Sequence, residues 1–547
     1  MTNGTSKSDA KPWNVMIYMA ADNNLSEECV YALKEIDRLK LPAEISVVAQ
    51  LDSNVKGVLP KRYLFNRKSA KNAQTAQARQ GAKQETWSTN GHILPSSKVD
   101  GGLSKREDQD FSNKIHKSQK QMKVKGVTNN GRKPLNFENS ADPKVLQNFL
   151  IEGIKNHKSD RQVVILSGHG SGARGDFLRD SNPRTSMRIV DLKEALQGVV
   201  KKLPGKNARI DILGMDSCLM SMIEVCYEMS GVARYLVGAE GFELEGGWPY
   251  HSILEELSDD SGMEVKDFAC AIVRRYIKYY SDYVIAGVSV DQAACDLSKP
   301  KVDILTSEMK LLVEALIAGL TNPIIKDAII LAHWNAQSYK FEQYTDLWDF
   351  CHLLYQWCEP FCESSKEGKI SITYEDAEYT ARVKETIEKI AAACDKVKLA
   401  IKKENEGGLV LKSCYSGPRV QYSQGISIYF PWNGATLSND YGNLKFAMVT
   451  GWHRFLKAYV KATLRPLRND CGRKGKPCGP IGAPFSQTAD GNFPLGNRDG
   501  EFTKDGEFTK DGEFTKALEN SPNIMKNHPD TFFECDCSSE PASTTAK

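Results

Sequence analysis

Short apolar runs alternate with longer segments of helical periodicity over the first half of this chain. The runs are rich in Val, Ile and Leu and cover 13–20, 44–51, 161–167, 209–215 and 234–239. Buried parallel strands have this continuous apolar pattern, and the helices between them return the chain to the start of the next strand. The alternation therefore predicts an α/β fold, with a mostly parallel sheet covered by helices on both faces.

Start signals for helices lie in the segments that connect these runs. Ser26 follows a polar turn and is a candidate N-cap for a helix to about Leu39, whereas Asp142 and Pro143 are an N-cap and a first-turn proline. Helical patterns also cover 143–157, 190–202, 219–229, 265–280, 299–320, 374–403 and 444–460, and a late apolar run covers 425–431. The second half of the chain is therefore predicted to be rich in helices.

Two long stretches lack this periodicity. One is crowded with Lys, Arg, Gln, Asn and Ser, and the other holds three identical tandem copies of Asp-Gly-Glu-Phe-Thr-Lys that offer no aliphatic position for a stacked core. We predict a disordered N-terminus (1–11), an α/β core (12–65 and 137–260), a disordered basic insertion (66–136), a helix-rich C-terminal part (261–464) and a low-complexity tail (465–547).

Composition narrows the classes of partner. A chain of 547 residues with 41% apolar residues can form several cores, and its net charge of +3 does not indicate a nucleic acid or an anionic membrane. The basic insertion lacks interleaved aromatic residues, which favours solvated chain over a nucleic-acid site. Without a signal-peptide-like segment or an apolar run of about 18 residues, we expect a cytoplasmic protein, although non-classical export stays open.

The fourteen Cys residues are scattered along the chain, as buried thiols usually are. The pairs Cys471/Cys478 and Cys535/Cys537 lack the C-x-x-C spacing of a zinc site and have no His at a matching distance. The sequence therefore predicts no metal site.

Two of the apolar runs stop at a residue that can perform chemistry. His169 follows the run 161–167, and Cys218 follows the run 209–215. Open α/β sheets bind ligands beyond the carboxyl ends of their strands, so these side chains are expected to lie together. A cysteine attacks as its thiolate, and a histidine beside it can take the thiol proton and return it to a leaving amine. Each residue alone is compatible with a structural role, and it is their joint placement that favours a catalytic site.

The backbone around these residues offers two further features. The N–H groups of Gly170 and Cys218 lie at tight turns beside the point of attack, so they are candidate oxyanion donors. A helix that begins at Leu219 would also favour a thiolate at Cys218 through its N-terminal dipole.

In this order and with these flanks, the residues resemble clostripain-like cysteine peptidases, whose fold is shared with caspases, legumains and gingipains. The resemblance covers roughly 13–65 and 138–462 of the chain. It includes the Ala-Asp-Asn-Asn turn after the first run, Asp142-Pro143, Ser-Gly-His169-Gly170, Asp216-Ser-Cys218-Leu-Met, and the segments 246–250, 345–347, 425–431 and 450–452. It implies a caspase-like three-layer α/β/α sandwich with a helix-rich C-terminal half.

By this resemblance the protein is a monomeric cysteine endopeptidase that cleaves proteins or peptides after Arg or Lys. Cys218 is its nucleophile and His169 its base, a dyad with no obligatory third carboxylate. Asp216 fits this specificity independently, because a carboxylate two residues before the nucleophile can pair with a guanidinium; its alternative role is that of a turn or capping residue.

The chain departs from the family pattern at Pro249, where many relatives are expected to have an acidic residue. Glu240, Glu243 and Glu245 are candidates to compensate for it, so the preference between Arg and Lys stays open.

Many relatives are activated by self-cleavage after the catalytic histidine. Arg179, Arg184 and Arg188 lie between His169 and Cys218, and Arg184 and Arg188 fit best if 180–186 is an exposed turn. No cofactor is assigned. Some relatives depend on calcium, and Asp22 and Asp52 lie near strand ends, but the chain shows no EF-hand-like ligand spacing.

Two other functions remain open at this stage. The same dyad could serve a different acyl-transfer specificity. Alternatively, the chain could be a catalytically silent scaffold that recruits partners through its basic insertion and tail, although a scaffold requires neither His169 nor Cys218.

Overall fold

The computed structural model describes residues 13–53, 61–65, 139–182, 184–205, 208–339, 343–362, 371–402, 407–432, 437–438 and 441–463. All of them belong to one compact unit, Met1–Leu464. The predicted N-terminal segment, basic insertion and tail lie outside the described residues, and the proposed domain boundaries stay predictions.

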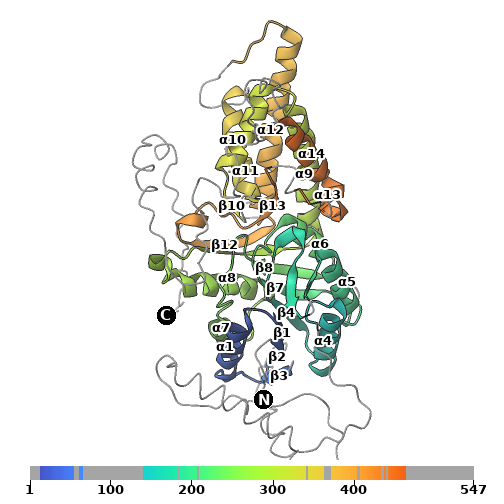
Figure 1. Ribbon diagram of the computed structural model, residues 1–547, viewed down its shortest axis with the longest axis vertical. Helices are drawn as coiled ribbons and strands as arrows, with labels where there is room; N and C mark the ends of the chain where they lie inside the picture. Colours follow the sequence, from blue (N-terminus) through green and yellow to red (C-terminus); the bar gives the residue numbers. More distant parts are fainter. Residues whose placement is uncertain are drawn as a thin grey trace, which may run out of the picture. The chain divides into compact units, whose positions relative to one another are not determined.

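An eight-stranded sheet in the order β12-β9-β8-β7-β4-β1-β2-β3 forms the centre of the fold (Figure 1). Its parallel strands are β1 (Trp13–Ala21), β2 (Ile45–Ser53), β4 (Arg161–Ser167), β7 (Ile210–Asp216) and β8 (Ala233–Gly238). Towards the edges β3 (Lys61–Phe65), β9 (Val290–Asp296) and β12 (Val410–Ser416) add antiparallel pairings. The predicted α/β fold with a mostly parallel sheet is confirmed.

Helices cover both faces of this sheet, as the apolar runs predicted (Figure 1). One layer contains α1 (Ser26–Asp37), α7 (Tyr250–Asp259) and α8 (Val265–Ser281), and the other contains α4 (Pro143–Asn156), α5 (Ile189–Val200) and α6 (Ile223–Met229). The rings of Trp13 and Phe268 are 5.4 Å apart on the α8 side, and those of Tyr18 and Phe149 are 5.8 Å apart on the α4 side. Successive residues of β1 thus enter two different cores.

The C-terminal half is mostly helical. It comprises α9 (Lys299–Gly319), α10 (Pro323–Asn335), α11 (Leu347–Cys358), α12 (Ala377–Ile401), α13 (Lys445–Thr450), α14 (Trp452–Thr463) and a small sheet of β10 (Ser338–Tyr339), β11 (Tyr344–Asp346) and β13 (Ser427–Tyr429). The predicted helix 444–460 is divided, because Gly451 adopts a left-handed φ of 76° between α13 and α14.

The predicted helix starts differ in outcome. Asp142 does cap α4, since its side chain accepts a hydrogen bond of 2.8 Å from the Lys144 N–H with Pro143 in the first turn. The prediction for Ser26 was wrong, because Leu25 is the N-cap, Ser26 is already the first residue of α1, and its hydroxyl donates to the Ala21 carbonyl. Ser26 instead ties the start of α1 to the end of β1.

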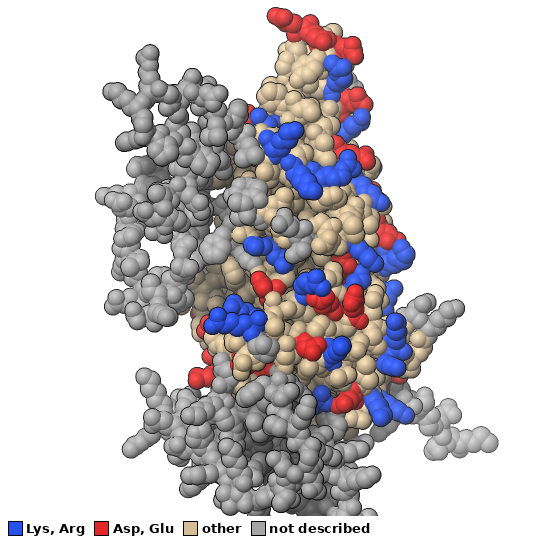
Figure 2. Space-filling view, turned by 45° about the vertical axis from the view of Figure 1, so that its right-hand side comes forward, with Lys and Arg blue, Asp and Glu red and all other residues tan. Residues whose placement is uncertain are grey.

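Charges on the described surface are mixed in sign. Figure 2 shows Lys and Arg interspersed with Asp and Glu on this face of the molecule. Several oppositely charged residues of the described surface are neighbours along a helix, such as Lys299 with Asp303 (2.5 Å) and Lys389 with Glu385 (2.7 Å). Exposed pairs of this kind contribute little to stability.

None of the helices in the described ranges is both long and apolar enough to cross a membrane.

Candidate active site

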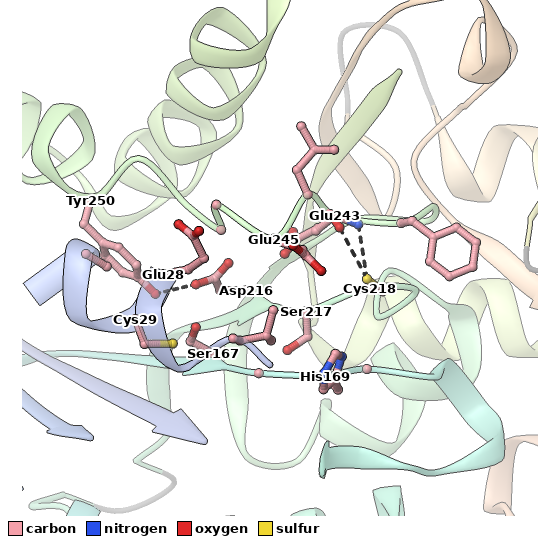
Figure 3. Close-up of a pocket in the computed structure, with 18 residues that line it drawn as sticks. Glu28, Cys29, Ser167, His169, Asp216, Ser217, Cys218, Glu243, Glu245 and Tyr250 are labelled. Carbon is pink, nitrogen blue, oxygen red and sulfur yellow. Dashed lines mark hydrogen bonds between the residues drawn. The ribbon is translucent and has the colours of Figure 1, made fainter. Parts of the chain in front are cut away.

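A pocket of about 280 Å³ opens beyond the carboxyl ends of β4 and β7 (Figure 3). Its walls come from α1, from the loops that follow β4 and β7, and from the segment 242–250. His169, Gly170, Asp216 and Cys218 all line it. The structure therefore brings the predicted nucleophile, base, oxyanion donors and specificity residue into one cavity.

Cys218 is held by the backbone of Glu243. Its thiol lies 3.6 Å from the Glu243 carbonyl oxygen, to which it donates, and accepts a hydrogen bond of 3.3 Å from the Glu243 N–H (Figure 3). Burial raises the pKa of Cys218 to about 12. Cys218 is therefore a neutral thiol at rest, and it requires a base before it can attack.

The loop that carries Cys218 is not the start of a helix, which corrects the expected dipole effect. Leu219 has a left-handed φ of 64°, and α6 begins only at Ile223. The Leu219 N–H donates to the Gly241 carbonyl (2.9 Å), and the Ser221 N–H donates to the Ala239 carbonyl (2.8 Å). These hydrogen bonds join the loop to a segment about 20 residues further along the chain, and they take the place of a first helical turn at Leu219. Consequently no α6 dipole acts directly on the sulfur.

The C-terminal half holds the other side of this loop. The Ser221 hydroxyl donates to the Gly425 carbonyl (2.8 Å), and the Ser427 N–H donates to the Ser221 carbonyl (3.0 Å). The predicted strand 425–431 thus helps to hold the loop that carries Cys218. It does so from β13, in the small sheet, rather than from the central one.

His169 is partly exposed at the edge of the pocket. Its Nε2 lies 2.7 Å from the Asn24 side-chain oxygen. Burial lowers the pKa of His169, the Arg179 charge adds to this effect and the Glu245 charge opposes it. Among the described residues no hydrogen bond joins His169 to Cys218, an arrangement common before a substrate carbonyl enters between base and nucleophile.

Gly170 lies tightly against the nucleophile loop. A Cβ at this position would overlap the Cys218 carbonyl oxygen and would lie 3.0 Å from Ser217 Cβ. Within the described chain, neither the Gly170 N–H nor the Cys218 N–H donates to a backbone carbonyl. Both groups therefore stay candidates for the oxyanion donors, and only glycine allows the two loops to approach this closely.

Asp216 has the structural role that the sequence left open, and its role as a specificity residue stays a prediction. Its Oδ1 accepts from the Trp248 N–H (3.0 Å) and its Oδ2 from the Tyr250 hydroxyl (2.7 Å), so it braces the segment 246–250. The same carboxylate faces the pocket. Burial raises its pKa, whereas hydrogen bonds from Tyr250, Ser167 and Glu243 lower it.

Glu243 lies beside Asp216, and the two carboxyl groups interact. Burial and the Asp216 charge raise the pKa of Glu243 well above its ordinary value. Both carboxyl groups accept two further hydrogen bonds, Asp216 from Trp248 and Tyr250 and Glu243 from Trp248 Nε1 (3.0 Å) and Gln292 (3.1 Å). The hydrogen bond between them lowers the pKa of Asp216 and raises that of Glu243, so we assign the negative charge to Asp216 and the proton to Glu243.

The other acidic candidates are divided by the structure. Glu245 lines the pocket with Glu243, whereas Glu240 is fully buried away from it and accepts a 2.6 Å hydrogen bond from the Gly425 N–H. Glu240 thus belongs to the junction with the C-terminal half. Sequence reasoning missed Glu28, which projects into the pocket from α1 (Figure 3). A Glu on a half-exposed helix gives no signal of such a role.

The segment with the three candidate cleavage sites forms a β-hairpin, so the predicted exposed turn over 180–186 is only partly correct. It consists of β5 (Phe177–Ser181) and β6 (Arg184–Met187). Arg179, Arg184 and Arg188 are exposed. Asp180, in contrast, is fully buried and accepts from the Ser140 N–H (2.7 Å) and hydroxyl (3.0 Å).

The speculative calcium ligands are both buried. Burial and the nearby Asp180 raise the pKa of Asp22. Over the described part of the chain, no group of three or more His, Cys, Asp or Glu residues could hold a metal ion. Asp22 and Asp52 thus do not form such a group there.

The chain is similar to several known proteins. A family model described as "Clostripain family" matches residues 17–459. Clostripain from Hathewaya histolytica is 26% identical over 150 residues, a match that spans 24% of this chain and 27% of that relative's length.

Among solved structures, a secreted C11 cysteine protease from Bacteroides thetaiotaomicron in complex with an irreversible peptide inhibitor is 16% identical. The alignment covers 81% of this chain and 99% of that one with a TM-score of 0.46. An inactive zymogen C11 protease from Parabacteroides distasonis is 17% identical, with coverages of 80% and 98% and a TM-score of 0.45.

Proposed function

Because the chain belongs to the clostripain family of cysteine peptidases, we propose that it is an endopeptidase that cleaves after Arg or Lys with Cys218 as nucleophile and His169 as base. The observation that carries the proposal is the lining of the pocket. Cys218 and His169 share it with the carboxyl groups of Glu28, Asp216, Glu243 and Glu245, and among the described residues no Lys or Arg lines it.

The reaction follows from the positions of these groups. When a peptide carbonyl binds between the two loops, His169 takes the thiol proton and the Cys218 sulfur attacks the carbonyl carbon. The N–H groups of Gly170 and Cys218 stabilise the resulting oxyanion. The protonated imidazole then donates to the leaving amine, and water hydrolyses the thioester that remains. Since the pKa of Cys218 is raised and that of His169 lowered, proton transfer occurs during attack rather than in a resting ion pair.

The pocket supports a basic side chain before the cleaved bond. Asp216 lies two residues before Cys218 and lines the inner wall of the pocket, where the charge of its carboxylate is buried. A guanidinium or ammonium that enters would pair with Asp216 in a partly desolvated site, where such contacts are strong.

Glu28 is the second negative charge available to this side chain. It makes no hydrogen bond or ion pair with another described residue, so the substrate need not displace a partner. We expect Glu28→Gln to lower kcat/KM for Arg and Lys peptides about 3- to 10-fold at nearly unchanged kcat, since a partly exposed pair contributes about 1 kcal/mol.

The matched control for Glu28 is Glu27→Gln. Glu27 precedes it on α1, is exposed and does not line the pocket. Steady-state kinetics of the two variants test the assignment, and equal losses in both, or none in either, would contradict a role of Glu28 in substrate binding.

Self-cleavage between His169 and Cys218 is part of the proposal, and Arg184 is the best candidate. It lies at the tip of the hairpin, where it pairs with Ser181. Arg179 precedes the buried Asp180, and its carbonyl accepts from Asn23 (2.8 Å). Arg188 forms an ion pair with Asp191 (2.7 Å) before α5. Cleavage after Arg184 therefore disturbs the fewest contacts.

The test of the proposed function is hydrolysis of matched fluorogenic peptides with Arg, Lys or Asp before the scissile bond. The same samples are run on a denaturing gel to detect self-cleavage. We expect turnover of the Arg and Lys peptides only. No turnover by intact or processed protein, together with a Cys218 that does not react with alkylating probes, would favour a silent scaffold. Equal turnover of the Asp peptide would indicate a different specificity.

A further inference from the structure

Asn24 contacts the catalytic imidazole from the turn that follows β1. Its side-chain oxygen lies 2.7 Å from His169 Nε2, and its side-chain nitrogen donates to Glu245 Oε1 at 3.2 Å. The oxygen and nitrogen of an amide must be assigned from their partners. A carboxylate can only accept, so Glu245 requires the Asn24 NH₂ group on its side. The amide oxygen must therefore face the imidazole.

This orientation determines which imidazole nitrogen carries the proton. An amide oxygen only accepts, so the group that faces it must be an Nε2–H. In the neutral ring the lone pair then lies on Nδ1, because one nitrogen is the donor and the other the acceptor. Glu245, Asn24 and His169 thus form a chain of hydrogen bonds that ends with a basic Nδ1.

We propose that Asn24 is a positioning residue that fixes His169 as the Nε2–H tautomer, so that Nδ1 is the atom that takes the Cys218 proton. The inference rests on the proposed function for the identity of the base, but the tautomer follows from the hydrogen bonds alone. The dyad then has an uncharged third member, which comes from the first strand of the fold.

The turn around Asn24 is built to hold its side chain in place. The neighbouring Asn23 donates to the carbonyls of Ala20 (3.0 Å) and Arg179 (2.8 Å) and accepts from the Leu25 N–H (2.9 Å). These three bonds fix the backbone against β1 and β5. The side chain of Asn24 is exposed, but the backbone that carries it is held in place by these bonds. The contact between Asn24 and His169 is therefore preorganised by the turn.

An amide in this position suits the neutral base that the mechanism requires. A carboxylate would stabilise the imidazolium and raise the pKa of His169, whereas an amide orients the ring without adding a charge. The charged groups that act on the imidazole are Arg179 from β5, which lowers its pKa, and Glu245, which raises it. A change at Asn24 should therefore be visible in the pH profile.

The test compares Asn24→Ala, Asn24→Asp and the wild type. Loss of the acceptor in Asn24→Ala allows both tautomers and other ring orientations, so kcat should fall at least about 10-fold while KM changes less than about twofold. Asn24→Asp keeps the acceptor and should recover most of kcat, with the acid limb of the kcat/KM profile moved to higher pH. Asn335→Ala is the control, since Asn335 is likewise an exposed Asn, and its side chain donates to the Leu331 carbonyl (2.9 Å).

A purely structural role predicts a different pattern, with both Asn24 variants losing thermal stability and activity together and no shift of the pH profile. The tautomer itself is measured by ¹⁵N NMR of the His169 ring in the Cys218→Ala protein, which requires no turnover. An Nε2–H signal in this protein that is lost or exchanges in the additional Asn24→Ala variant supports the proposal. An Nδ1–H tautomer, or unchanged kcat in Asn24→Ala, overturns it. If the wild type hydrolyses no peptide, the proposed function fails while the NMR experiment still decides the tautomer.

Discussion

Replacement of Cys218 by alanine is expected to abolish peptide hydrolysis, with a fall in kcat of at least about 10⁴-fold. The sulfur is the atom that bonds to the substrate carbonyl carbon, and no other described group in the pocket takes its place in the proposed reaction. The fold should persist, because the side chain contributes only the weak contacts of 3.6 and 3.3 Å with the Glu243 backbone. Turnover and the melting temperature, measured on the same preparation, test both statements.

Cys29→Ala is the matched control for this variant. Cys29 is a second thiol that lines the pocket, it is buried, and burial raises its pKa to about 12 as well. It lies on α1, away from the two oxyanion donors, so kcat should stay within a few-fold of the wild type. Retained hydrolysis by Cys218→Ala, or an equal loss in Cys29→Ala, would show that the nucleophile has been misassigned.

The second large effect is expected from Asp216→Asn, which removes the buried charge and keeps the shape. We expect kcat/KM for Arg peptides to fall about 10³-fold, because loss of one partner of a buried charge pair costs about 2–5 kcal/mol. The amide oxygen can still accept from the Trp248 N–H, and the Tyr250 hydroxyl can rotate to accept from the new NH₂ group. The segment 246–250 should therefore stay in place.

A peptide with an uncharged Gln before the scissile bond separates the two roles of Asp216. Loss of substrate pairing affects only the basic peptides, and the Gln peptide should be hydrolysed as slowly by the variant as by the wild type. If the two kinds of peptide lost activity equally, Asp216 would be a structural brace for Trp248 and Tyr250 and not a specificity residue.

The strands that hold the site could be predicted from sequence because they are buried on both faces. β1, β4 and β7 form continuous apolar runs, and His169 and Cys218 mark the ends of two of them. The helix predicted after β7 is present as α6, but it begins at Ile223 rather than at Leu219 for a tertiary reason. Its residues favour a helix locally, but bonds to Gly241 and Ala239 hold the loop in another conformation. Local propensity yields to such contacts.

The remaining parts of the site depend on pairings that no local pattern encodes. β9 (Val290–Asp296) was not predicted, since the sequence Val-Asp-Gln-Ala-Ala-Cys-Asp is short and neither continuously apolar nor alternating. Asn24 and Glu28 are ordinary residues of a turn and a helix. Their proposed roles arise only because the sheet places them beside His169 and Asp216, and Asn24 is separated from His169 by 145 residues.

The central claim is tested most directly by covalent labelling with an Arg peptide that carries an acyloxymethyl ketone, followed by mass spectrometry. The account predicts one equivalent of label on Cys218, protection by an excess of Arg substrate, and no labelling by the corresponding Asp probe. Absence of label, label on Cys29 or another thiol, or equal labelling by the Asp probe would contradict it.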